Sequence, residues 1–283
     1  MILRSLHISA LLLASGLGLA GSAAAELPPE GAPGSMATAP ATPKAAAEAD
    51  LLPFRPVTLA ANWGPLPARF RPSPKGKSPA VLIIGASGRS LEGMDPLARR
   101  LQALGYTVLS VQNPAGIIRK DGMGIPILDR RRISMDGIPD LVRDLHAALR
   151  FLKDAPEASP GPLAVVGEGL GVSLAAHLGA ESDRVAVVAY VVPAKECDPF
   201  ATRAALEKAS ERKPSLLITG IKDQTYRAWF EQALPNTAGL TLLDPLTRPG
   251  GAEEEQGAWA SHEIPFPQDV AAWLVTCFPL GKN

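Results

Sequence analysis

The chain has no excess of charge of either sign, because Lys plus Arg and Asp plus Glu each number 28 among its 283 residues. Proteins that bind nucleic acid or an acidic membrane surface usually carry a basic excess, so the charge balance predicts neither partner. The sequence also lacks a metal-ligand spacing, a coenzyme fingerprint and a nucleic-acid motif. We therefore expect no cofactor, no metal and no nucleic-acid partner.

The N-terminal region lacks an apolar run long enough to cross a bilayer. Its apolar stretch covers residues 8–19, whereas a spanning helix needs about 18 to 20 residues. The stretch follows the basic Arg4 and precedes Ala23 and Ala25, which have the A-x-A spacing of a cleavage site. We predict a signal peptide over residues 1–25, and an uncleaved anchor helix is the alternative. Cleavage makes the protein an exported one, periplasmic or secreted.

Large apolar residues are also scarce between residues 26 and 50, where proline and alanine dominate. Such a segment has little to bury, so we expect a disordered or extended tether. The two cysteines of the chain, Cys197 and Cys277, lie far beyond it, so none near the cleavage site can carry a lipid. We therefore expect no stable membrane anchor.

After residue 50, short apolar runs typical of buried strands alternate with runs typical of helices. The expected strands cover residues 56–63, 66–72, 79–86, 106–113, 162–169, 185–193, 214–223 and 240–246. The expected helices cover residues 95–105, 133–154, 170–180, 225–234 and 267–278. This alternation predicts one α/β domain over residues 51–283, with a mostly parallel central sheet and helices on both faces.

One stretch, AVVGEGLGVSLAAHLG (164–179), predicts a strand, a sharp turn and a small-residue helix. Its glycines are Gly167, Gly169 and Gly171. A phosphate-binding turn is the alternative, but the G-x-G-x-x-G pattern is not completed, because position 172 is Val172.

Four stretches resemble motifs of the α/β-hydrolase family, most of all its dienelactone-hydrolase-like and esterase-like branch. Residues 79–88 (PAVLIIGASG) are similar to the strand and loop of the oxyanion hole, and residues 165–171 (VVGEGLG) to the G-x-S-x-G elbow. Residues 216–224 (LLITGIKDQ) are similar to the strand that ends in the acid, and residues 261–274 (SHEIPFPQDVAAWL) to the histidine loop. The resemblance implies an α/β-hydrolase fold with these motifs in the family's order.

The resemblance also implies the roles of single residues. Gly169 stands at the nucleophile position, which is therefore vacant, since glycine has no side chain to attack an ester. Asp223 and His262 match the acid and the histidine and would form a remnant dyad; the alternative for Asp223 is a helix cap. The backbone N–H groups of Ala86 and Leu170 match the oxyanion donors.

Two further features have a candidate functional role: a serine near the predicted oxyanion loop and a basic cluster. In the fold that the resemblance implies, the strand before Ser87 neighbours the elbow strand and ends at the same sheet edge, so Ser87 is the alternative nucleophile. Ser173 should lie deeper along the helix. Arg119, Lys120 and residues 130–132 form a basic cluster that either attracts an anionic ligand or is a solvated loop.

The acidic run Glu253–Glu255 is expected in the histidine loop, where it is either solvated or functional. Taken together, these observations predict an exported, catalytically degenerate serine hydrolase that binds a small molecule or a protein partner. The alternative is an active esterase or dienelactone-hydrolase-like enzyme that uses Ser87 and His262.

Overall fold

The computed structural model describes residues 51–62, 64–114, 119–120, 126–127, 138–193, 199–220, 228, 239–244, 249–261 and 263–280. All of them belong to a compact unit that spans Ala45–Asn283. The predicted signal peptide and tether, residues 1–25 and 26–50, lie outside the described residues.

The described residues form an eight-stranded sheet in the order β1-β2-β4-β3-β7-β8-β9-β10. Its strands are β1 (Arg55–Ala61), β2 (Gly64–Arg71), β3 (Ser78–Ile84), β4 (Thr107–Val111), β7 (Ala158–Gly169), β8 (Val185–Pro193), β9 (Ser215–Ile218) and β10 (Leu240–Leu243). Strand β2 is antiparallel to β1 and β4, and all neighbours from β4 to β10 are parallel. Two short strands, β5 (Arg119–Lys120) and β6 (Pro126–Ile127), pair separately.

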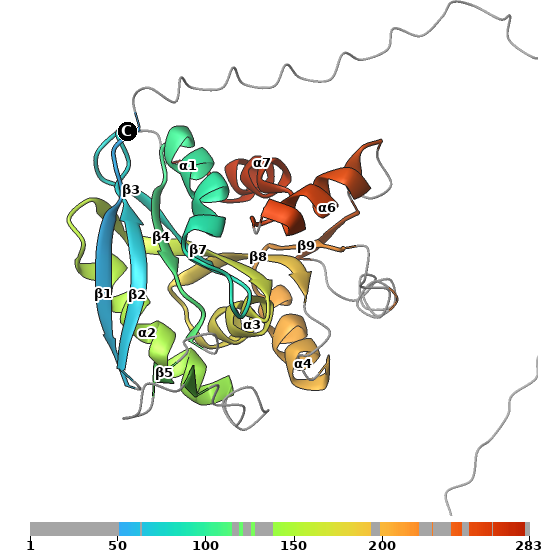
Figure 1. The fold of residues 1–283 in the computed structure, drawn as a ribbon, viewed down its shortest axis with the longest axis horizontal. Coiled ribbons are helices and arrows are strands. Elements are labelled where there is room, and N and C mark those ends of the chain that lie inside the picture. The colour runs from blue at the N-terminus through green and yellow to red at the C-terminus, as the bar shows by residue number, and fades with distance from the viewer. Residues whose placement is uncertain are drawn as a thin grey trace, which may run out of the picture. The chain divides into compact units, whose positions relative to one another are not determined.

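Helices cover both faces of the sheet (Figure 1). Helices α1 (Asp95–Leu104) and α7 (Pro267–Cys277) pack on one face, and α2 (Ile138–Asp154), α3 (Gly171–Glu181) and α4 (Pro199–Ser210) pack on the other. Alternate residues of β3 show why: Val81 and Ile83 join the core under α1, while Leu82 and Ile84 join the core under α2 and α3. A strand buried on both faces needs a continuous apolar run, which is what predicted these strands.

The register of the central strands brings three chain segments to one edge. Ile84 at the end of β3 lies opposite Val111 of β4 on one side and Gly167 of β7 on the other. The residues that follow these positions therefore meet at the carboxyl edge of the sheet, where ligands bind in open α/β sheets.

The predicted strands and most predicted helices are confirmed, with three differences. The short paired strands β5 and β6 were not expected, and they include Arg119 and Lys120. Helix α4 was not expected, and α6 (Gly251–Ser261) shows that Glu253–Glu255 lie on a helix and not in a loop. Segment 251–261 is rich in alanine and glutamate, which favour helix, but it has no apolar stripe from which a helix could be predicted. The expected helix 225–234 lies outside the described residues except for residue 228, and α2 is described from Ile138.

Candidate functional site

The predicted sharp turn between strand and helix is present at Gly169. Strand β7 ends at this residue, and helix α3 begins at Gly171 after a single intervening residue, Leu170. Gly169 has a φ of 56°, in the left-handed region that a residue with a Cβ adopts only with strain. The backbone at the tip of the turn is therefore one that glycine holds without cost.

The flanking glycines allow a close approach of backbones around the turn. A Cβ at Gly167 would overlap the carbonyl of Gly171, and a Cβ at Gly171 would overlap the carbonyl of Ile84. The first turn of α3 therefore packs directly against the end of β3, and no larger residue fits at either position.

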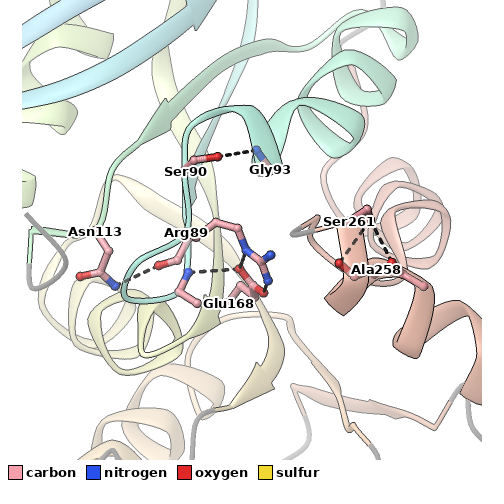
Figure 2. A network of polar contacts seen from close by, with 10 residues as sticks. Arg89, Ser90, Gly93, Asn113, Glu168, Ala258 and Ser261 are labelled. Carbon is pink, nitrogen blue, oxygen red and sulfur yellow. Dashed lines mark hydrogen bonds and ion pairs between the residues drawn. The ribbon is translucent and has the colours of Figure 1, made fainter.

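Next to the turn lies a buried ion pair between Glu168 and Arg89. The Glu168 side chain has no solvent exposure, and 4% of the Arg89 side chain is exposed. Glu168 Oε2 accepts hydrogen bonds from Arg89 Nε at 2.9 Å and from the backbone N–H of Ala86 at 3.1 Å. Arg89 Nη2 donates to Glu168 Oε1, so the pair is bidentate (Figure 2).

The peptide unit between Gly85 and Ala86 is held at both ends. Its N–H donates to Glu168, and its carbonyl accepts a hydrogen bond of 2.9 Å from Asn113 Nδ2 (Figure 2). Asn113 follows β4 and is fully buried. Side chains from the ends of β4 and β7 thus fix the orientation of this one peptide.

Gly85 also makes room for the arginine. A Cβ at Gly85 would lie 2.9 Å from Met94 Cε and 3.0 Å from Arg89 Cγ. The missing side chain lets the Arg89 stem fold back over the loop and reach Glu168.

Ser87 lies in a tight turn that closes with a hydrogen bond of 3.0 Å from the N–H of Arg89 to the carbonyl of Ala86. Gly88, with a φ of 79°, takes the left-handed position of this turn. Ser87 is exposed at the carboxyl edge of the sheet. Ser173 is instead fully buried in α3 and bonds Thr202 Oγ1 at 2.7 Å, so it does not reach this edge.

Helix α6 reaches the same edge through a buried carboxylate. Glu255 is 1% exposed, and a Cβ at Gly220, just beyond β9, would lie 2.6 Å from Glu255 Oε1 and 2.6 Å from Val192 Cγ1. Val192 has a φ of 43°, where a β-branched residue is strained, and it lies where the register between β7 and β8 shifts from Glu168 to Gly169. The side chain of Glu255 therefore packs over the ends of β8 and β9.

Several predicted site residues stay predictions. Asp223 and His262 lie outside the described residues, and so does the proposed dyad. Leu170 occupies the expected turn, and the N–H of Ala86, the other predicted oxyanion donor, is engaged by Glu168. Figure 2 shows Ser261 at the end of α6, with its hydroxyl donating to carbonyls of its own helix.

The sequence reasoning did not identify Glu168, Arg89 or Asn113. One signal was available for Glu168, because a charged residue at the end of a buried apolar strand requires a partner. No pattern in the sequence indicated that Arg89 would pair with Glu168 or that Asn113 would bond the adjacent peptide. His177 lies on α3, away from the turn: burial lowers its pKa, and its Nδ1 lies 3.7 Å from Glu181 Oε1.

Within the described ranges, no group of three or more His, Cys, Asp or Glu side chains is arranged to hold a metal ion. No helix in the part of the chain that the structure describes is long and apolar enough to span a membrane.

No family model and no curated protein matches the chain. Solved structures do match. A dienelactone hydrolase from Anabaena variabilis has a TM-score of 0.57 and 20% identity, covering 80% of this chain and 98% of that one. A Pyrobaculum calidifontis esterase has a TM-score of 0.52 and 18% identity, covering 80% and 86%.

A Pyrococcus furiosus esterase has a TM-score of 0.52 and 17% identity, covering 80% of this chain and 91% of that one. Likeness at these identities establishes the fold alone. Together with the strand order, it shows that the chain has a dienelactone-hydrolase-like α/β-hydrolase fold.

Proposed function

We propose that the protein is an exported α/β-hydrolase-fold protein that has lost serine-hydrolase activity and binds a small molecule or a protein partner. The observation that carries this proposal is Gly169, which stands at the tip of the turn with a φ of 56°. Acyl transfer in this fold needs a hydroxyl or thiol at that position. The turn keeps its backbone geometry without the reactive atom.

The surroundings of Ala86 support the same conclusion. In a working site, its N–H would stabilise the negative oxygen that develops during ester cleavage, an effect worth about 3 kcal/mol per donor. Here the N–H donates to the Glu168 carboxylate. The donor is therefore occupied by the Glu168 carboxylate and is not free to bind a developing oxyanion.

The test is labelling of the purified protein with a serine-directed fluorophosphonate probe, with an active serine hydrolase as positive control. We expect no labelling, because no activated serine lies at the turn. Stoichiometric labelling would refute the proposal.

A second candidate function is ester hydrolysis by Ser87, with His262 as the base. Its supporting observation is that Ser87 is exposed at the same sheet edge as Gly169. Labelling that disappears in Ser87→Ala and in His262→Ala would establish it. A Ser90→Ala variant, which changes another exposed serine of the same loop, serves as the control and should label like the wild type.

A further inference from the structure

Glu168 and Arg89 form a buried ion pair, and the proposed function gives this pair no binding role of its own. Transfer of a carboxylate into a protein interior is unfavourable unless the charge is paired and its lone pairs accept hydrogen bonds. Glu168 meets both conditions through three donors, which are Ala86 N–H, Arg89 Nε and Arg89 Nη2.

All three donors come from one short segment, residues 86–89, whereas the carboxylate comes from β7, 79 residues beyond Arg89. The turn that closes from Arg89 N–H to the Ala86 carbonyl places the amide and the guanidinium side by side. Asn113 holds the other end of the Ala86 peptide, and the absent Cβ of Gly85 leaves space for the arginine stem. The donor arrangement is therefore built by residues other than Glu168.

We propose that the Ala86 amide and the Arg89 guanidinium form a receptor for one carboxylate, and that this chain fills the receptor with its own Glu168. The chemical class that fits is a small carboxylate anion, which the guanidinium fork binds bidentately. In the wild-type protein the receptor is closed to external anions. The inference deepens the proposed function and rests on it for one consequence: a ligand bound beside Gly169 is uncharged where it faces this receptor.

The experiment is chemical rescue of Glu168→Ala by formate. The readout is the midpoint of thermal unfolding of the full chain. The substitution leaves the Arg89 charge buried without its carboxylate, so we expect the midpoint to fall by about 10 °C. Formate should raise this midpoint by several degrees, in proportion to the logarithm of its concentration at high formate. Chloride at equal ionic strength should not.

The matched control is Glu168→Gln, which keeps the side-chain volume and an oxygen acceptor for the Ala86 N–H. Its midpoint, like that of the wild type, should respond to formate no more than to chloride. An equal response of Glu168→Ala to formate and chloride would overturn the proposal.

A second pair of variants decides the matter if Glu168→Ala does not fold. Glu168→Asp and Glu168→Asn have the same size and differ in charge, so a carboxylate receptor predicts a clearly higher midpoint for the aspartate variant. Equal midpoints would overturn the proposal. These thermal readouts do not depend on fluorophosphonate labelling, so a failure here and a failure of the proposed function are distinguishable.

Discussion

At the scale of single residues, Gly169 decides what chemistry the turn can perform. Its φ of 56° is accessible to glycine without strain and costs about 1 kcal/mol for a residue with a Cβ. A chain no longer selected for turnover gains stability from glycine at such a position. The residue is therefore the place to test whether the turn is a nucleophile elbow.

We predict that Gly169→Ser lowers the free energy of unfolding by about 1 kcal/mol and introduces slow fluorophosphonate labelling. Labelling should be slow because the Ala86 N–H is engaged by Glu168. A further His262→Ala change should abolish it.

Gly169→Ala is the matched control, since it carries the same backbone strain without the hydroxyl. It should lose similar stability and remain unlabelled. A folded Gly169→Ser protein that is more stable than the wild type and unlabelled would mean that this turn is not an elbow.

Gly171 tests the close approach of α3 to β3. Because a Cβ there would overlap the Ile84 carbonyl, Gly171→Ala should lower the free energy of unfolding by about 2 kcal/mol, measured by urea denaturation. Gly161→Ala is the control, since nothing lies within 4 Å of a Cβ at that position. Similar free energies of unfolding for the two variants would show that α3 can move away from β3 without loss of stability.

At the scale of elements, α6 contacts the end of the sheet through the buried Glu255 carboxylate. On this helix Gly251 and Glu255 are buried, while Glu253 is exposed. The segment has no apolar stripe, so apolar periodicity did not predict α6. We infer that the buried Glu255 side chain contributes to the docking of this helix.

We predict that Glu255→Ala speeds amide hydrogen exchange across residues 251–261 and leaves exchange in α7 unchanged. The reason is that the substitution removes the side chain that packs over Gly220 and Val192. Glu253→Ala should leave exchange as in the wild type. Equal exchange rates in the two variants would show that residues other than Glu255 hold α6 in place.

Helix α7 is tied to the start of β4 by Tyr106. Its hydroxyl donates to the Phe278 carbonyl at 2.7 Å, and its ring stacks on that of Phe278. Burial raises the pKa of Tyr106 from 10.0 to about 12. The neutral phenol is therefore favoured in the folded protein.

The pKa of Tyr106 predicts a loss of stability in alkali. The pKa of Tyr106 is higher in the folded protein than in the unfolded one. The contribution of Tyr106 to the free energy of unfolding is therefore complete below pH 10 and is lost as the pH rises to about 12. The loss is on the order of 2 kcal/mol. Burial raises the pKa of Tyr190 as well, so both tyrosines contribute.

Tyr106→Phe keeps the ring and removes the ionisation. Its unfolding free energy should decline less steeply than that of the wild type between pH 10 and 12. Parallel declines would show that Tyr106 does not ionise on unfolding.

At the scale of the whole molecule, the proposed export requires that a segment before the α/β domain be removed as a signal peptide. The A-x-A spacing of Ala23 and Ala25 predicts that the exported protein begins at Glu26. N-terminal sequencing of the material released by the cells checks this. A start at Met1 would refute cleavage.

The sequence by itself determined most of the secondary structure and the turn at Gly169. Buried strands and amphipathic helices leave their period in the sequence, and left-handed or crowded backbone requires glycine at fixed spacing. These are local requirements, so neighbouring residues reveal them. The roles of Asp223 and His262 rest on the resemblance to the α/β-hydrolase motifs and stay predictions.

Only the tertiary structure decided what surrounds that turn. The contact of Glu168 with Ala86 joins residues 82 positions apart, and that of Asn113 with Gly85 joins residues 28 apart. Such contacts depend on which strands are neighbours and in what register, which the pairing of the whole sheet decides and the residues adjacent to each contact do not. The Arg89–Glu168 ion pair depends on the neighbouring positions of β3, β4 and β7 in the sheet, so the sequence alone did not predict it. A buried charge needs a partner, and the tertiary structure decides which residue that partner is.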